Sequence, residues 1–292
     1  MKESYMKKYT CSCLTLLFLL AVVPIARGND KTTYPQRIIS LGPINTENIY
    51  LLGAEDHLIA DTIYCVNPPA ARKKEKIGTL LQVNVEKIIG LNPDLVLATS
   101  LTRPRQVAQL RRLGISVVQF KQPAGFDDIA VQFVELGRLT GREKRARQIV
   151  VKARRAIDYI RQKTIRLPKR KVFLQVGTRP LFSSVATSFT NEFITLGGGE
   201  NIAKGSLEGV YSREKVIAQN PDLIIIAIMG TEGIAGKKEK QKWMRYPSIT
   251  AVKNENIHII DPDLVCSPTP LSFVEALRTI TSLIHPEIDI NE

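Results

Sequence analysis

The chain has 292 residues, of which 44% are hydrophobic and 24% charged, and this composition excludes a disordered or low-complexity protein. Its 41 Lys and Arg residues exceed its 28 Asp and Glu residues, which gives a formal net charge of +13. Such a surplus would favour a nucleic-acid partner in a cytosolic protein, but the N-terminal segment predicts export and makes that class a poor candidate.

Residues 1–28 have the parts of a secretory signal peptide. Three lysines precede an apolar stretch over 14–25, and the small residues Ala26 and Gly28 mark a cleavage site before Asn29. The apolar stretch is shorter than the roughly 20 residues that span a bilayer. We therefore expect a cleaved signal and a periplasmic protein, with a retained N-terminal anchor as the alternative. Cleavage removes four basic residues and one acidic residue, which lowers the formal charge to +10.

The first half of the mature chain alternates short aliphatic segments with helical ones. Alternation of this kind predicts a parallel, right-handed α/β sheet. Strands are expected over 37–40, 57–61, 95–98 and 115–120, and helices over 45–52 and 105–113.

One segment occurs twice, because residues 86–97 (EKIIGLNPDLVL) return 128 residues later as 214–225 (EKVIAQNPDLII). Asn84 and Ser212 precede the copies and predict helix N-caps. The Asn-Pro pair ends each helix, and the aliphatic run after it predicts a strand that is buried on both faces. Two similar units of helix, turn and strand predict two similar lobes, with a ligand cleft between them.

Two helices, expected over 126–137 and 143–165, take the place of a flexible linker between the lobes. In the second helix, Ile149, Ala153 and Ile157 recur at helical spacing. At 1.5 Å per residue this helix is about 35 Å long, enough to pass along both lobes. The expected organisation is an N-terminal α/β lobe over 36–123, a linking helical segment over 124–167 and a C-terminal α/β lobe over 168–292. In the second lobe, strands are expected over 171–176, 223–227 and 257–261, and helices over 188–196 and 271–284.

Several motifs occur in an order that is more specific than any one of them. They are residues 37–43 (RIISLGP) with Thr46-Glu47, Tyr64 with Pro68-Pro69, the duplicated segments, and residues 198–202 (GGENI). Over essentially the whole mature chain they resemble the solute-binding proteins of importers for cobalamin, iron-siderophores and haem. The resemblance implies two Rossmann-like lobes with mainly parallel sheets, joined by one long backbone helix. It also implies a ligand held between the lobes and delivered to a membrane permease.

The resemblance also implies a role for Glu86 and Glu214. In this family one surface Glu from each lobe meets Arg pockets on the ABC permease dimer in the inner membrane, and these two residues occupy the matching motif positions. Exposed charges of this kind steer encounter more than they add affinity. The alternative is that each Glu only stabilises the positive end of its helix dipole.

Candidate ligand-binding residues follow from the expected topology, since ligands of parallel sheets lie beyond the carboxyl ends of the strands. Tyr64 suits stacking on a flat ligand or ligation of ferric iron, or it is an ordinary rim tyrosine. Arg103 and Arg179 suit carboxylate or phosphate oxygens, or they are solvated surface arginines. Tyr211 has the same alternatives as Tyr64. The loop 261–270 is expected at the same edge.

Cys65 and Cys266 are the only cysteines left after cleavage, and both map to loops on the cleft side. One alternative is a disulfide in an exported protein. A second is soft ligation of a bound metal, and a third is a pair of unrelated buried thiols.

The ligand class stays open. The single tryptophan, Trp243, differs from the several Trp residues of the cobalamin-binding branch, whereas residues 173–175 with 182–183 are nearest to that branch. We expect a metal chelate of corrinoid or iron-siderophore type, bound as a transported ligand and not as a cofactor. Haem or an oxyanion such as molybdate is the alternative. The three scattered histidines do not predict a site for a bare metal ion.

Two other classes would share this fold, a double-Rossmann enzyme and a ligand-presenting sensor protein. An enzyme of this type predicts a phosphate-binding glycine turn after a first strand or a cluster-binding set of cysteines. The glycines at 197–199 follow a helix instead, and only two cysteines remain. We therefore expect no catalytic residues and no nucleic-acid partner, and we expect a monomer.

Overall fold

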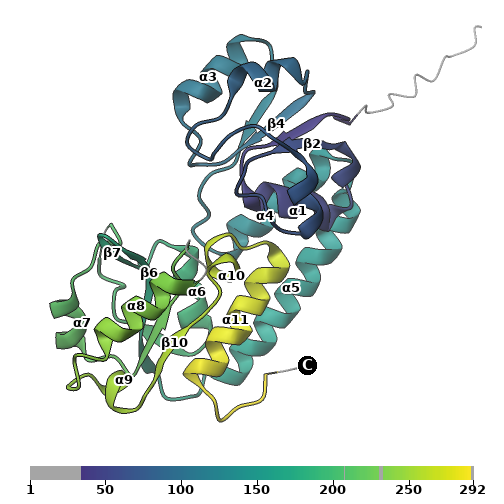
Figure 1. Cartoon of the computed structure of the whole chain (residues 1–292). Coiled ribbons are helices and arrows are strands. Elements are labelled where there is room, and N and C mark those ends of the chain that lie inside the picture. Colours follow the sequence, from purple (N-terminus) through teal and green to yellow (C-terminus); the bar gives the residue numbers. More distant parts are fainter. Residues whose placement is uncertain (1–33, 207, 230–232, 291–292) are drawn as a thin grey trace, which may run out of the picture. The chain divides into compact units, whose positions relative to one another are not determined.

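The computed structural model describes residues 34–206, 208–229 and 233–290 (Figure 1). The predicted signal peptide lies outside the described residues. Tyr34–Glu292 form one compact unit, which contains two separate five-stranded sheets. None of the helices in the described ranges is long and apolar enough to cross a membrane.

The first sheet has the strand order β3-β2-β1-β4-β5, and all its neighbouring strands are parallel. Its strands and helices form the N-terminal lobe. These elements are β1 (Ile38–Ser40), α1 (Pro43–Leu52), η1 (Glu55–His57), β2 (Leu58–Asp61), η2 (Pro69–Lys73), β3 (Glu75–Lys76), α2 (Val85–Gly90), β4 (Leu95–Ala98), α3 (Pro104–Arg112) and β5 (Val117–Gln119).

The second sheet has the order β10-β9-β6-β7, with β8 paired to β6, and only the β6–β7 pair is antiparallel. This sheet and its helices form the C-terminal lobe. The elements are β6 (Arg170–Thr178), β7 (Leu181–Ser183), α6 (Phe189–Leu196), β8 (Gly199–Asn201), α7 (Arg213–Gln219), β9 (Leu223–Ile226), α8 (Ile234–Trp243), α9 (Thr250–Lys253), β10 (Ile257–Ile259), α10 (Pro262–Cys266) and α11 (Pro270–Ile284). The predicted α/β class with mainly parallel sheets is confirmed.

Each sheet buries both of its faces, as the aliphatic runs predict. In β4, Leu95 and Leu97 face one hydrophobic cluster, and Val96 and Ala98 face another. In β9 the same alternation divides Leu223 and Ile225 from Ile224 and Ile226. Because side chains alternate between the two sides of a strand, an uninterrupted apolar run packs against the helices on both faces of the sheet.

Two helices link the sheets, α4 (Phe126–Leu139) and the 22-residue α5 (Glu143–Thr164). Helix α5 packs against α4, α6 and α11. Figure 1 shows α5 running beside α11. Its buried residues include the predicted Ala153 and Ile157, and the predicted Ile149 is partly buried against the same cluster. One continuous hydrophobic cluster contains residues of β1, β4, α4, α5, β6, β9 and α11. The predicted long backbone helix is therefore present, and it joins the lobes through a shared core.

The duplicated segments fold as α2 with β4 and as α7 with β9. The N-cap side chains of Asn84 and Ser212 accept hydrogen bonds from backbone N–H groups at 2.9 and 3.2 Å. Asn92 and Asn220, which precede the prolines, have positive φ angles of 44° and 46°. Asn tolerates this left-handed conformation better than most residues, so it suits the end of a helix.

The duplicated aspartates have the same structural role in both lobes. The Asp94 carboxylate accepts backbone N–H bonds from Gln36 and Arg37 at 2.8 and 2.9 Å. The Asp222 carboxylate accepts the Lys171 N–H at 2.7 Å. Each copy thus fastens its unit to the beginning of the neighbouring central strand, β1 or β6.

Candidate ligand-binding cleft

A cavity of about 360 Å³ lies between the two lobes, within the range of roughly 300–1,000 Å³ that is usual for ligand sites. Its walls follow the carboxyl ends of β1, β2, β9 and β10, where ligands of parallel sheets bind. The N-terminal lobe contributes Pro43, Glu47, Ile63, Tyr64, Val66 and Asn67, and the C-terminal lobe contributes Met229, Asp263 and Ser267.

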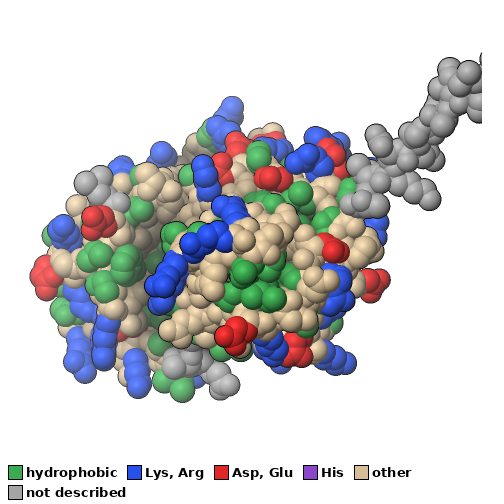
Figure 2. Space-filling model, turned by 90° about the horizontal axis from the view of Figure 1, so that it is seen from above, with side chains coloured by type: hydrophobic (Ala, Val, Ile, Leu, Met, Phe, Trp, Pro, Cys, Tyr) green, Lys and Arg blue, Asp and Glu red, His purple; other side chains and the backbone are tan. Residues whose placement is uncertain are grey.

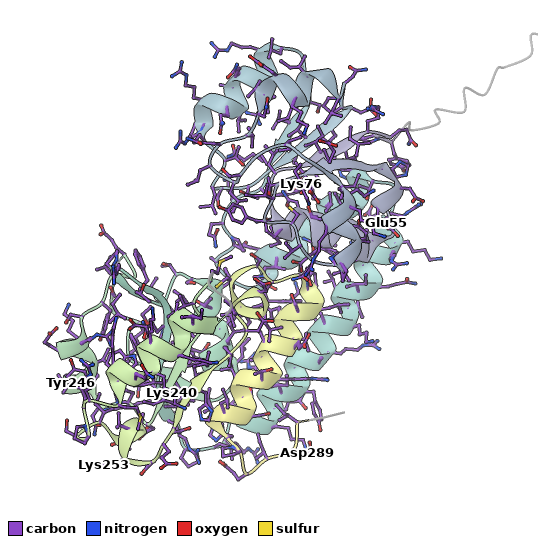
Figure 3. The ribbon with its side chains drawn as sticks, in the orientation of Figure 1. Glu55, Lys76, Lys240, Tyr246, Lys253 and Asp289 are labelled. Carbon is purple, nitrogen blue, oxygen red and sulfur yellow. The ribbon has the colours of Figure 1, made fainter. Side chains whose placement is uncertain are left out.

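Hydrogen bonds from Lys76 and Thr46 hold the loop that carries Tyr64 in place. The Lys76 ammonium group donates to Asp61 Oδ1 at 2.6 Å and to the carbonyl oxygens of Cys65 and Ala71 at 3.2 and 3.0 Å. Thr46 of α1 donates to Cys65 Sγ at 3.2 Å. Lys76 is labelled in the N-terminal lobe in Figure 3. These bonds tie the loop to β3 and α1 and so preorganise one wall of the cavity.

Apolar side chains form much of the accessible wall. Ile63 and Tyr64 are each 49% exposed and Met229 is 51% exposed. The Tyr64 hydroxyl has no hydrogen-bond partner in the described part of the chain. A half-exposed tyrosine with an unpaired hydroxyl has its ring face and its oxygen free for a ligand.

The polar part of the cavity is acidic. Burial raises the pKa of Glu47 from its ordinary value of 4.5 to about 7, and the nearby Asp263 carboxylate adds to this shift. Burial also raises the pKa of Asp263, with Asp261 contributing. Asn67 Nδ2 donates to Asp263 Oδ2 at 3.2 Å, so this hydrogen bond spans the two lobes. The described lining includes no Lys, Arg or His side chain.

A second cavity, of about 440 Å³, adjoins the first and shares Glu47 and Asn67 with it. Its other lining residues are Tyr50, Leu51, Pro68, Arg145 and Thr269. Thr269 is the N-cap of α11, and its side chain accepts the Ser272 N–H at 3.1 Å. Glu47 and Asn67 therefore line both cavities of the interlobe region.

Of the six predicted ligand-binding residues, the structure places Tyr64 on the wall of the first cavity. Cys65 is fully buried behind it, where burial raises the pKa of its thiol. Cys266 is partly buried beside Ser267, and burial raises its pKa to about 11. Both cysteines are free, so the structure has no disulfide between them. Neither thiol is among the residues that line the two cavities.

The other three candidates are not among the lining residues of the two cavities. Arg103 is exposed at the beginning of α3, and Arg179 is exposed in the turn between β6 and β7. The Tyr211 hydroxyl donates to the Ile202 carbonyl at 3.1 Å, and its ring centroid lies 5.7 Å from that of Phe173. Asp263 and Ser267 belong to the loop 261–270, which was expected at this edge. Glu47, Asn67 and Met229 were not among the predicted ligand-binding residues, although Glu47 is part of the Thr46-Glu47 motif.

Glu86 and Glu214 are exposed at equivalent positions, each two residues after an N-cap in the first turn of its helix. A hydrogen bond from its own backbone N–H lowers the pKa of Glu214. These positions suit both a surface contact and a helix-dipole interaction, and docking stays a prediction.

Comparison with known proteins agrees with this architecture. Residues 38–264 match the model of the family described as periplasmic binding protein. An uncharacterized ABC transporter substrate-binding lipoprotein of Bacillus subtilis (strain 168) is 31% identical over 263 residues, which are 87% of this chain and 81% of that protein. The vitamin B12-binding protein of Yersinia pseudotuberculosis serotype O:3 (strain YPIII) is 34% identical over 195 residues, 66% of this chain and 69% of that protein.

Solved structures show the same fold. The periplasmic vitamin B12 binding protein of Vibrio cholerae has a TM-score of 0.75 at 26% identity, covering 86% of this chain and 97% of that one. The periplasmic haem binding protein of Vibrio cholerae has a TM-score of 0.76 at 22% identity, covering 86% and 99%. With two linked α/β lobes, a cavity between them and a family match over most of its length, the chain belongs to the periplasmic binding protein family.

Proposed function

We propose that this protein is the substrate-binding component of an ABC importer and that it captures a metal chelate of corrinoid or iron-siderophore type. The observation that carries the proposal is the cavity between the lobes, whose lining includes Tyr64 of the N-terminal lobe and Met229 of the C-terminal lobe. The names of the relatives support the ligand class, since they include vitamin B12-binding proteins. The chelate is cargo in this account and not a resident cofactor.

Haem is a second candidate ligand because of Tyr64. Its hydroxyl has no partner in the described part of the chain and borders the cavity, so a ferric centre has an oxygen ligand available. An iron-siderophore would use the same oxygen only where the siderophore leaves a coordination position open.

The proposal includes export and docking. The signal peptide is removed before Asn29, and the monomeric mature protein meets a two-fold permease through Glu86 and Glu214. Related points on two similar lobes suit a partner with two-fold symmetry. Both glutamates are exposed in first helical turns, which supports this assignment.

A thermal-shift screen of the purified exported protein tests the ligand class. Cyanocobalamin, haemin, ferric siderophores and molybdate are the probes. A ligand that binds only the native state stabilises it by RT ln(1 + [L]/Kd), which is about 2.7 kcal/mol at a hundredfold excess over Kd. A shift with a corrinoid or a siderophore supports the proposal. A shift with molybdate alone, or with none of the probes, contradicts it.

A further inference from the structure

The charge of the cavity is opposite to the charge of the protein. The whole chain has a formal net charge of +13, and Lys and Arg side chains are spread over the face seen in Figure 2. The described lining of the first cavity instead contains two carboxyl groups, one from each lobe, and no basic side chain. The net positive charge of the protein therefore does not indicate the charge of the ligand, because the ligand must fit the charge inside the cavity.

Arg145 is a basic side chain of the adjoining cavity, and it forms no ion pair with Glu47 or Asp263. It lines the second hollow with Glu47, but its Nε donates to the Leu51 carbonyl at 2.7 Å. Glu47 forms no ion pair in the described part of the chain, and burial together with the Asp263 carboxylate raises its pKa.

The remaining polar atoms add acceptors. Asn67 uses its Nδ2 on Asp263, and its amide oxygen has no partner in the described part of the chain. Glu47, Asp263 and this amide oxygen thus offer mainly hydrogen-bond acceptors to a ligand. A ligand carboxylate placed among them would lose hydration and meet like charges, whereas an amide N–H or an ammonium group would be paired.

We propose that Glu47 and Asp263 determine specificity: the cleft accepts chelates that present N–H donors or positive charge to these carboxyl groups and rejects chelates that present a carboxylate there. This inference rests on the proposed function, since it names the chemistry of the cargo in the same cavity. A cationic or donor ligand relieves the repulsion between the two acids in the empty cleft, and an anionic ligand increases it.

Matched ligands that differ by one group test the inference. The first set is cyanocobalamin and its b-, d- and e-monocarboxylic acids, in which one amide becomes a carboxylate. The second set is ferrioxamine B, which has a free ammonium group, and its N-succinyl derivative, which ends in a carboxylate. Affinities are measured by titration calorimetry at pH 8 for the exported protein, the double variant Glu47→Gln/Asp263→Asn, and the control Asp56→Asn. Asp56 is an exposed acid in η1, outside the lining of both cavities.

For the set that binds, we expect at least one carboxylate derivative to bind the unmodified protein about tenfold or more weakly than its parent. The double variant should reduce that ratio to less than about threefold, and Asp56→Asn should leave it unchanged. Equal binding of parent and derivatives, or a ratio that survives in the double variant, overturns the inference and leaves the proposed function standing. If neither parent binds and the thermal-shift screen finds no other corrinoid or siderophore, the proposed function fails and the inference fails with it.

Discussion

Glu47 is a partly buried acid of the cleft, and its burial could not be predicted from the sequence. Thr46-Glu47 is visible as a motif, but burial beside an acid of the other lobe depends on residues more than 200 positions away. Tyr64 was predicted because it follows a strand, and it does line the cavity. Tyr211 also precedes a recognisable cap, yet its hydroxyl and ring are used in packing its own lobe. The order of the strands does not show in which direction the side chain of a residue in the following loop points.

The raised pKa of Glu47 predicts a pH-dependent stability. Its folded value of about 7 exceeds its ordinary value of 4.5, so the native state binds more protons between these values and stability falls as pH rises through this window. The charged or titratable groups around it are Asp263, Tyr64, Tyr50 and Arg145.

We expect Glu47→Gln to stabilise the ligand-free protein at pH 8 by on the order of 1–2 kcal/mol, after allowance for partial solvent screening. The gain should nearly vanish at pH 4. Urea unfolding of both proteins at the two pH values measures it, with Asp56→Asn as the surface control. An equal difference at both pH values would show that the Glu47 charge is not its source.

At the scale of elements, the repeated segments were the most predictable part of the fold. Their caps, their Asn-Pro ends and their buried strands occur as expected, and α5 ends within one residue of its predicted range. The short elements β3, β7, β8, α9 and α10 were not predicted. They have two to five residues each, too few for a periodic pattern. The antiparallel β6–β7 pair depends on strand pairing, which composition does not encode.

Helix α5 provides a test of the shared core. Ile160 is fully buried in the cluster that connects both sheets, whereas Val151 on the same helix is 48% exposed. We expect Ile160→Ala to lower the free energy of unfolding by about 2–5 kcal/mol, because it removes apolar contacts and leaves a cavity. Val151→Ala should change it by no more than about 0.5 kcal/mol.

Chemical denaturation followed by circular dichroism compares the two α5 variants. One cooperative transition is expected in each, since both sheets share the core. Two separated transitions, with only one affected by Ile160→Ala, would show that the lobes are independent.

At the scale of the whole molecule, the proposed ligand site and the proposed docking residues lie on different parts of the surface. Glu86 and Glu214 lie outside the lining of both cavities. Substitution of Glu86 and Glu214 should therefore affect delivery of the ligand to the permease without affecting ligand binding. The two-lobe architecture and the family were predictable from the order of motifs, but the cavity lining was not, because it combines side chains from segments distant in sequence.

The double variant Glu86→Lys/Glu214→Lys tests docking. We expect ligand affinity to change less than about twofold and uptake into cells to be lost, because reversed charges repel a basic permease surface. Glu143→Lys, in the first turn of α5, is the control for charge reversal at a helix start; it also breaks the Glu143–Arg147 ion pair and should still retain uptake. Normal uptake by the double variant would contradict the docking role.

The central claim is that the interlobe cavity holds the cargo. Calorimetric titration of the best ligand from the thermal-shift screen measures this with the exported protein, the cavity-filling variant Ser267→Trp and the surface control Val131→Trp, a position that is 65% exposed on α4. We expect one site per chain in the exported protein and in Val131→Trp, and an affinity at least about a hundredfold weaker in Ser267→Trp, because the indole occupies the cavity. Undiminished binding by a folded Ser267→Trp would contradict it.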